Sequence, residues 1–458
     1  MSINKAIVLL FVSACMLIAQ NALAGADWQD KQKQMFSSIS VKPGDIIDKS
    51  NWEKAKGLLP APILNWLKDG KWAIKVAEFK YDFDYTKQWY DLSAKNKGKY
   101  GVGPNKELIE LSTGKFPLYL TGMPFPDLDV ENDPQGPVKL MHNNNLCLQM
   151  NASYDNIGDP KNGCLQWIGQ QGYERGNGFL MQHFYYWNRP DGEQQNPNQY
   201  MRTTSLLATW PYDISGTATL YVRYLDGRDD SVYAYVPSIR RVKRLSGANR
   251  SDPQLGSDQC MDDSDGWNGN NSSMIWTYMG EATMLIPKWK GDLEGPRVMK
   301  KNDIGAWDAY REDCVRSAWE DKDPSWTGDP WAWTTATCGW APREVWIIKA
   351  TPTDPYYAYG TYEFYIDKLT RLPVYNMKYN RANEYWKMMA NAHCMTQIPD
   401  PKYAPTANAF NMNGPMIVVD EKRHHASYTP LDETHMMADS PRVVARNHTP
   451  QTMKTWTK

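Results

Sequence analysis

The sequence has no excess of charge of either sign and only a few histidines. Of its 458 residues, 51 are Lys or Arg and 52 are Asp or Glu, which gives a formal net charge of −1. Because nucleic-acid-binding proteins usually carry a basic excess, this balance argues against nucleic acid as the main partner. The mean hydropathy of −0.64 excludes a polytopic membrane protein.

Common catalytic and cofactor-binding motifs are also missing. The chain has no Gly-x-Gly-x-x-Gly, P-loop, Gly-x-Ser-x-Gly or His-Glu-x-x-His pattern. No two cysteines are spaced as a zinc knuckle, and none precedes histidine as in a c-type haem site. We therefore expect no enzyme activity, metal or cofactor, although a fold can bring together two carboxylates that no motif reveals.

The first 24 residues have the layout of a secretory signal peptide. Lys5 is followed by an apolar stretch over residues 6–19 and by a small-x-small cleavage pattern at residues 22–24. An alternative is lipidation at Cys15, which ends a lipobox-like segment. The apolar stretch continues beyond Cys15, so cleavage after Ala24 fits better, and we expect a protein exported to the periplasm of a Gram-negative cell.

An even number of cysteines remains after cleavage, which in an exported chain indicates disulfides. Six cysteines allow fifteen pairings. Proximity along the chain favours Cys147–Cys164 and Cys314–Cys338, and Cys260–Cys394 is the less certain remainder.

What the sequence does have is an unusual set of large side chains and a long region of strand-like alternation. It contains 20 Trp, 27 Tyr and 22 Met but only 10 Phe. From about residue 200 to residue 429, apolar residues alternate with polar ones in short segments separated by turns, such as Asp226-Gly227. The strands that we expect cover residues 217–224, 232–236, 274–279, 343–350, 360–366, 372–379, 385–389, 416–419 and 425–429.

This pattern predicts a mainly β protein with some α structure. An antiparallel sheet needs one face covered, and the helical segments lie near the N-terminus. We expect a large curved antiparallel sheet whose concave side holds a helix, a ligand or both. The single domain should span residues 25–430, with inserts near 143–178 and 306–342 and a mostly irregular tail at 431–458.

Several separated motifs resemble a bacterial family of unknown function that is labelled outer-membrane lipoprotein-sorting-protein-like. The hallmark is YVPSIRRVKRLSGANRSD at residues 235–252. The further motifs are GSD at 256–258, DSDGWNG at 263–269, IWTYMG at 275–280, MPFPDLD at 123–129 and YIDKLTR at 365–371. The family is similar, distantly, to the periplasmic lipoprotein carriers LolA and LolB, which are incomplete barrels closed by helices around an acyl-chain cavity. The resemblance implies an incomplete β-barrel with N-terminal helices against its concave face. By association, it also resembles partners of envelope exporters. The resemblance implies no catalytic residues.

Two groups of residues are candidates for ligand binding. Large side chains at alternate strand positions should share one face and line an apolar cavity, although an ordinary core would show the same pattern. They are Trp276, Tyr278, Trp346, Ile348, Tyr362 and Phe364. A basic rim for an anionic head group or partner is formed by Arg240, Arg241, Lys243 and Arg244, which could instead be solvated or paired with Asp262, Asp263 and Asp265.

Three other patterns suggest weaker hypotheses. The insert at 306–342 is rich in tryptophan, which stacks on sugar rings, and this suggests a cell-envelope glycan-binding or glycan-processing protein. Its tryptophans are Trp307, Trp319, Trp326, Trp331, Trp333 and Trp340. The acids Asp258–Asp265 fail the EF-hand frame for calcium. The histidines His424, His425, His435 and His448 are irregularly spaced for a metal site.

The combined expectation is a periplasmic carrier for a lipid, lipoprotein or other amphiphile. An acyl chain would occupy the concave side of the sheet, and an inner-membrane exporter or outer-membrane protein would be a partner. The protein should be monomeric. Release of the ligand would need a movable lid, for which the N-terminal helix around Ile63–Leu67 is a candidate.

Overall fold

The computed structural model describes most of the chain after the N-terminal leader. The described residues are 28–81, 84–147, 153–158, 165–246, 250–289, 293, 295–309, 328–329, 338–403, 410–412, 416–429 and 434–456. None of the helices in these ranges is long and apolar enough to span a bilayer.

Helices are few and short. Residues 28–37 are helical. The other α-helices are α2 (Ala61–Lys68), α3 (Lys87–Ala94) and α4 (Gly136–Cys147). The 3-10 helices are η1 (Trp52–Ala55), η2 (Pro237–Ile239), η4 (Gln254–Gly256), η5 (Met261–Gly266), η6 (Asn271–Ser273), η8 (Pro401–Tyr403), η9 (Ala445–Asn447) and η10 (Thr452–Thr455).

Strands dominate the rest of the structure. In the first half they are β1 (Ile46–Ile47), β2 (Ile74–Lys75), β3 (Tyr100–Val102), β4 (Leu108–Glu110), β5 (Ser153–Gly158), β6 (Leu165–Gly169), β7 (Gly172–Tyr185), β8 (Tyr200–Trp210), β9 (Ala218–Tyr224), β10 (Ser231–Val236) and β11 (Arg241–Leu245). In the second half they are β12 (Met274–Trp289), β13 (Arg297–Val298), β14 (Lys300–Lys301), β15 (Trp307–Asp308), β16 (Cys338–Pro352), β17 (Thr361–Asp367), β18 (Pro373–Tyr379), β19 (Tyr385–Asn391), β20 (Cys394–Gln397), β21 (Phe410–Met412), β22 (Met416–Asp420), β23 (His425–Thr429) and β24 (Thr434–Ala438).

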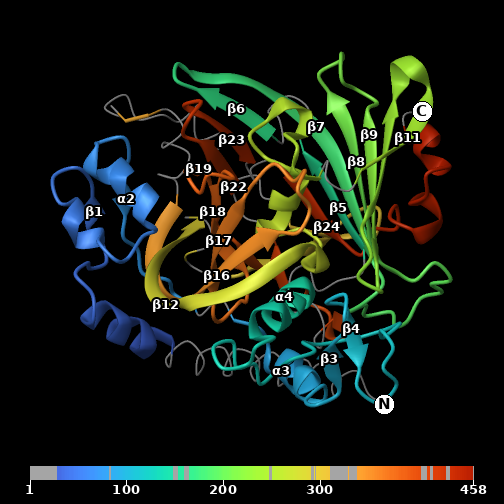
Figure 1. The fold of residues 1–458 in the computed structure, drawn as a ribbon, viewed down its shortest axis with the longest axis horizontal. Helices are drawn as coiled ribbons and strands as arrows, with labels where there is room; N and C mark the ends of the chain where they lie inside the picture. The colour runs from blue at the N-terminus through green and yellow to red at the C-terminus, as the bar shows by residue number, and fades with distance from the viewer. Residues whose placement is uncertain are drawn as a thin grey trace, which may run out of the picture.

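One large antiparallel sheet of 13 strands organises the molecule. Its order is β12-β16-β17-β18-β19-β22-β23-β6-β7-β8-β9-β10-β11. A branch of β5, β24, β15 and β14 extends from β7. In the described residues no ladder joins β11 to β12, so the barrel is incomplete (Figure 1). The expected fold class is therefore confirmed.

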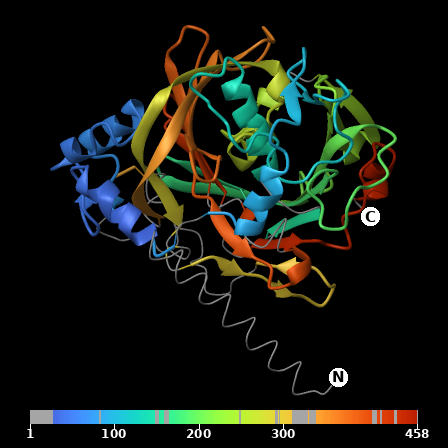
Figure 2. The ribbon, with the colours of Figure 1, turned by 90° about the horizontal axis from the view of Figure 1, so that it is seen from below.

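The two faces of the sheet are covered by different parts of the chain. In Figure 2 the strands form a ring around α4, whereas α2 and the helix at 28–37 lie outside the ring. Alternation along β16 fits this division, because Val345 packs in the outer core with α2 whereas Ile348 packs with Leu140 of α4. The concave helix is thus α4, and the lid that we expected around Ile63–Leu67 is wrong because this helix packs on the outer face.

The segment at 143–178 is not the surface insert that we expected. Its described part contributes the end of α4, the strands β5 and β6, and the start of β7. Its polar character has a structural cause, because Asn143 bonds both backbone groups of Phe125 and Asn144 donates to the carbonyl of Arg371. Buried amides that satisfy distant backbone groups look like loop residues in a sequence.

The C-terminal segment, expected to be mostly irregular, also contributes to the fold. Strand β24 pairs with β5. Met453 of η10 is buried and Trp456 packs beside it, against Leu220 and Tyr235 on the outer face of β9 and β10. This face has Leu220 and Val222, whereas Tyr221 and Arg223 project to the concave side.

Candidate functional site

A cavity of about 200 Å³ lies on the concave side of the sheet, between strands β8 and β9 and the segment that follows β11. Its walls are mainly apolar, with a few hydroxyl, amide and carboxylate groups. They are formed by Leu206, Ala208, Thr217, Ala218, Thr219, Tyr221, Leu245, Asp252, Pro253, Gln254, Leu255 and Met261. An apolar recess with a few polar groups is the usual form of a small-molecule site.

The strand register explains why these side chains face the cavity. Leu206 of β8 stands opposite Thr219 of β9. Tyr221 of β9 stands opposite Val232 of β10, which stands opposite Leu245 of β11. Because cross-strand partners point to the same face, one row of side chains connects the cavity to the edge of the sheet.

The far wall of the cavity is a small apolar cluster under the segment 252–256. Leu255 packs there against residues of β6, β7 and β8, including Leu165, Phe179 and Leu206. Leu255 has φ 52°, a left-handed conformation that is uncommon for a bulky residue. Its backbone is therefore held by its surroundings, among them the bond from Trp167 Nε1 to the carbonyl of Gly256 at 3.1 Å.

The basic edge strand β11 adjoins the cavity, since its residue Leu245 lines it. Arg241, Lys243 and Arg244 are exposed on β11, and Arg240 is exposed in the preceding turn with φ 50°. One interpretation of the sequence was that these cations pair with Asp262 and Asp263. In the structure they do not, because Asp262 binds Arg250 and Asp263 binds Lys378. The role of the basic rim in binding stays a prediction.

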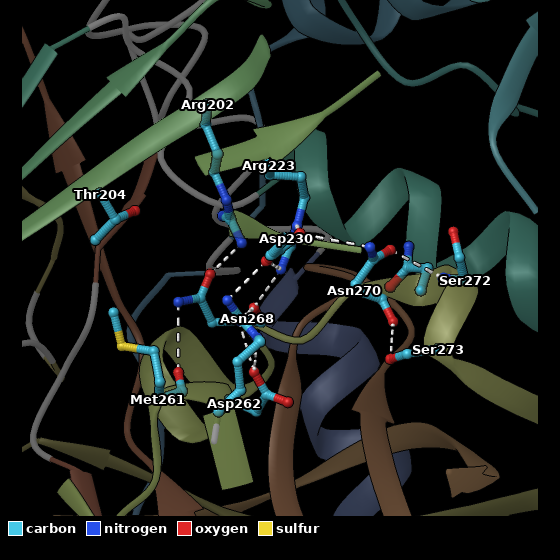
Figure 3. A network of polar contacts seen from close by, with 12 residues as sticks. Arg202, Thr204, Arg223, Asp230, Met261, Asp262, Asn268, Asn270, Ser272 and Ser273 are labelled. Carbon is cyan, nitrogen blue, oxygen red and sulfur yellow. Dashed lines mark hydrogen bonds and ion pairs between the residues drawn. The ribbon is translucent and has the colours of Figure 1, made fainter. Parts of the chain in front are cut away.

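The concave side is crossed by the segment 250–273, which we call the plug. Its residues 252–255 and Met261 also form a wall of the cavity. Figure 3 shows Arg202 and Arg223 reaching from the sheet toward Asp230 and the plug residue Asn268. Arg223 binds Asp230 with its Nη2 at 2.7 Å, and the plug residue Arg250 binds the same carboxylate at 2.6 Å. The hallmark motif of the sequence thus includes a buried ionic contact between plug and sheet.

Ionisation in this network follows from burial and pairing. Burial alone would raise the pKa of Asp230, but the charges of Arg223 and Arg250 hold it below its usual value. Burial lowers the pKa of Arg223 to about 10 despite Asp230, because Arg202 and Arg250 lie nearby. The pKa of Arg250 is raised instead, since Asp262 and Asp230 outweigh its desolvation. All three groups are charged at neutral pH, which fixes the plug electrostatically.

The other plug acids also contact the sheet. Asp263 binds Lys378 at 2.6 Å, with both side chains fully buried. Asp258 accepts bonds from His425 Nδ1 at 2.5 Å and from Ser427 Oγ at 2.8 Å. Burial raises the pKa of Asp265 to about 6. These contacts assign the acids of this segment to holding the plug.

The six residues predicted to line a cavity do share the concave face. Ile348, Tyr362 and Phe364 are fully buried in one cluster, against which Trp276, Tyr278 and Trp346 pack. The ring of Trp267, a plug residue, fills the space beside them, 5.2 Å from Phe364 and 5.5 Å from Trp276 between centroids. The structure brings all six together, and their contact with a ligand stays a prediction.

The remaining candidates are dispersed. Trp307 packs on Tyr403, and Trp340 is buried beside Trp72. Four further tryptophans lie outside the described residues: Trp319, Trp326, Trp331 and Trp333. His424 and His425 are at the β22–β23 turn, and the ring of His448 lies beside Trp456. No group of three metal-ligating residues occurs in the described part of the chain.

The predicted cysteine pairs are not formed in the structure. Cys147 and Cys260 are buried free thiols, so the Cys147–Cys164 and Cys260–Cys394 pairings are wrong here. Burial raises the pKa of the Cys147 thiol to about 12, which makes it unreactive. Cys338 is likewise a buried free thiol, so its predicted pairing with Cys314, which lies outside the described residues, is not formed in this structure either.

Sequence reasoning missed the residues that line the cavity. Leu206 and Ala208 lie at alternate positions of β8 and would have marked a concave face, but β8 was not among the expected strands. Leu255 gave no signal, because an isolated leucine between Gln254 and Gly256 looks like part of a loop. Only the assembled sheet shows where it packs.

Comparisons with known proteins give distant structural likenesses. No curated protein matches the chain significantly. A putative outer membrane lipoprotein-sorting protein domain from Vibrio parahaemolyticus is 12% identical, with 69% of this chain and 97% of that chain covered and a TM-score of 0.43. A DUF1329 family protein from Desulfovibrio piger is 12% identical over 66% and 90% of the chains, with a TM-score of 0.39. A LolA superfamily protein from Nitrosomonas europaea is 10% identical over 68% and 97%, with a TM-score of 0.35.

A family model gives a broader match. It covers residues 46–454 and describes proteins of unknown function (DUF1329). This range includes the plug, the basic edge strand and the incomplete barrel, and it confirms the resemblance that the sequence motifs indicate. The chain belongs to the DUF1329 family of proteins of unknown function.

Proposed function

We propose that the protein binds the apolar part of an amphiphile in the cavity between β8, β9 and residues 252–255, and that it acts as a periplasmic carrier. The observation that supports this most directly is the position of the cavity. The ionic network and α4 occupy much of the concave side, whereas the space beside Leu206 and Leu255 is open and mainly apolar.

The size of the cavity limits what can enter. At about 200 Å³ it is smaller than the roughly 300–1,000 Å³ of pockets that enclose drug-sized ligands. It suits the terminal part of one acyl chain. The rest of the chain would lie along Ala234, Val236 and Leu245, of which Val236 and Leu245 are 36% and 37% exposed. Such exposed apolar side chains beside a recess favour a binding role.

The proposed location rests on the N-terminal sequence. Residues 1–24 have the pattern of a signal peptide, which directs a chain across the inner membrane. A periplasmic carrier must shield an acyl chain from water between two membranes. Burying each methylene group contributes about 0.8 kcal/mol, so a few buried groups give measurable affinity.

Titration with a fluorescent fatty acid tests the cavity. Thr219→Trp places an indole in the cavity and should weaken binding at least about tenfold, since two displaced methylene groups are worth roughly 1.6 kcal/mol. Tyr233→Trp is the matched control, because Tyr233 lies on the opposite face of the sheet. Circular dichroism establishes that both variants fold.

Native mass spectrometry of the mildly purified protein gives an independent measurement. It should show a co-purified amphiphile in the wild type and less of it in the Thr219→Trp variant. A folded wild type that neither carries an amphiphile nor binds the probe would refute the proposal. Equal binding by the wild type and the Thr219→Trp variant would place the ligand elsewhere.

A further inference from the structure

We infer that the ligand is a single-chain amphiphile with an anionic head group, held by Arg241 and Lys243. This inference rests on the proposed cavity and specifies the class of ligand. It depends on which side chains of the basic edge strand face the cavity, a distinction that the sequence motif does not make.

The register of β10 and β11 divides the basic residues between two faces. Lys243 stands opposite Ala234, which stands opposite the cavity residue Thr219. Arg241 stands opposite Val236, one step further along the same face. Both cations are therefore on the concave side, in line with the row of Leu245 that lines the cavity.

Arg244 belongs to the other face. It stands opposite Tyr233, and its Nη2 donates to Ser231 Oγ at 3.2 Å. Tyr233 packs in the outer cluster with Val242. One short strand thus presents two cations toward the cavity and one away from it, so Arg244 serves as a built-in control.

The spacing matches an amphiphile. Lys243 precedes Leu245 by two residues on β11, about 7 Å at the rise of an antiparallel strand. Thr219 is two strands away from Lys243, roughly 10 Å. A chain that ends in the cavity and passes along Ala234 would bring its head group beside both cations.

The charge beside the cavity favours an anion. Arg240, Arg241 and Lys243 are exposed on or just before β11, whose Leu245 lines the cavity, and one carboxylate, that of Asp252, lies in the cavity wall. A cationic head group would meet repulsion, and a zwitterionic one would gain less than an anionic one. Because the cations are exposed, salt screens them, and the Debye length is already about 8 Å at 0.15 M ionic strength. The preference for the anionic lipid should therefore weaken as the salt concentration is raised.

Paired lysophospholipids test the head group separately from the chain. Lysophosphatidylglycerol and lysophosphatidylcholine of the same acyl length are titrated below their critical micelle concentrations, with inorganic phosphate as a third ligand. The wild type should bind the anionic lipid about tenfold more tightly at low salt, as expected for two exposed charge contacts. Phosphate alone should bind at most weakly, because it has no chain.

Three variants assign the effect to residues. Arg241→Gln combined with Lys243→Gln should abolish the preference, because it weakens binding of the anionic lipid more than binding of the zwitterionic lipid. Arg244→Gln should keep the preference. Asp252→Asn should strengthen binding of the anionic lipid, because it removes the opposing carboxylate.

The outcomes separate this inference from the proposed function. Failure to bind either lipid refutes the cavity itself. Equal affinity of the wild type for both lipids, or an equal loss in the Arg244→Gln control, overturns the head-group inference and leaves the cavity in place. Phosphate binding as tight as that of the anionic lipid would also overturn it, since the site would then recognise an ion without a chain.

Discussion

Arg250 is the residue whose loss should damage the fold most sharply. Its side chain is 5% exposed and lies between two carboxylates. Nη1 is 2.6 Å from Asp230, Nη2 is 2.6 Å from Asp262, and the guanidinium also donates to the carbonyl of Asn268. Arg250→Leu keeps only the first part of the apolar stem and removes all of these contacts.

The size of the effect follows from what each acid keeps. Asp230 retains Arg223 at 2.7 Å. Asp262 keeps only the hydrogen bond from the hydroxyl of Tyr357, at 2.6 Å, and has lost its cation. Removing one partner of a buried ion pair costs about 3–5 kcal/mol, because the other charge stays buried. We expect a loss of unfolding free energy in this range for Arg250→Leu.

Urea unfolding followed by tryptophan fluorescence measures the loss. The double variant Arg250→Leu with Asp262→Leu should recover part of the stability, since it removes the stranded carboxylate as well. Lys422→Met is the surface control. Its ion pair with Glu384 is about half exposed on the lysine side, and its loss should cost less than about 1 kcal/mol. A loss below about 1 kcal/mol for Arg250→Leu, or strictly additive effects in the double variant, would refute the reasoning.

Two further predictions concern acid stability and the plug backbone. Burial lowers the pKa of three histidines, to about 4 for two and about 3 for the third. They are His142, His448 and His393. Between pH 6.5 and about 4, the unfolded chain binds protons at these histidines and the native chain does not, so the urea midpoint should decrease as the pH is lowered. The decrease should be smaller in His142→Gln. A dependence on pH that this variant leaves unchanged would contradict the role of His142. Gly266 has φ +87°, and a Cβ there would lie 2.9 Å from the carbonyl oxygen of Pro373. Gly266→Ala should therefore lower the melting temperature more than the control Gly114→Ala, because Gly114 also has positive φ but open space around it. Equal decreases in the two variants would show that the contact with Pro373 is unimportant.

The sequence allowed much of the sheet to be predicted, because each strand carries its own alternation. Examples are the hairpin of β9 and β10, with its Asp226-Gly227 turn, and the strands β16 to β19, β22 and β23. Local periodicity survives in a sequence wherever one face of a strand differs from the other.

The interior of the barrel could not be predicted in the same way. The plug looks like an acidic surface loop, yet Asp263 and Lys378, which neutralise each other, are more than 100 residues apart and both fully buried. Helix α4 is polar because its amides bond to backbone groups of other segments. These pairings depend on how the sheet and the plug assemble, and no local pattern records them.

The division of the basic edge strand between two faces likewise required the register. The motif shows Arg241, Lys243 and Arg244 as one group, and a shift of one residue would exchange their faces. Only the pairing with β10 decides which of them approach the cavity.

The pairing of β24 with β5 has a consequence for folding. Residues 434–438 complete a ladder with residues 153–158, so a nascent chain presents an unpaired β5 edge until the later strand has been made. The outer face of β9 also stays bare until Met453 arrives. Such distant contacts slow folding, because the intervening loops must close first. Assembly of this protein therefore waits for nearly the whole polypeptide, and shortened translation products should remain aggregation-prone.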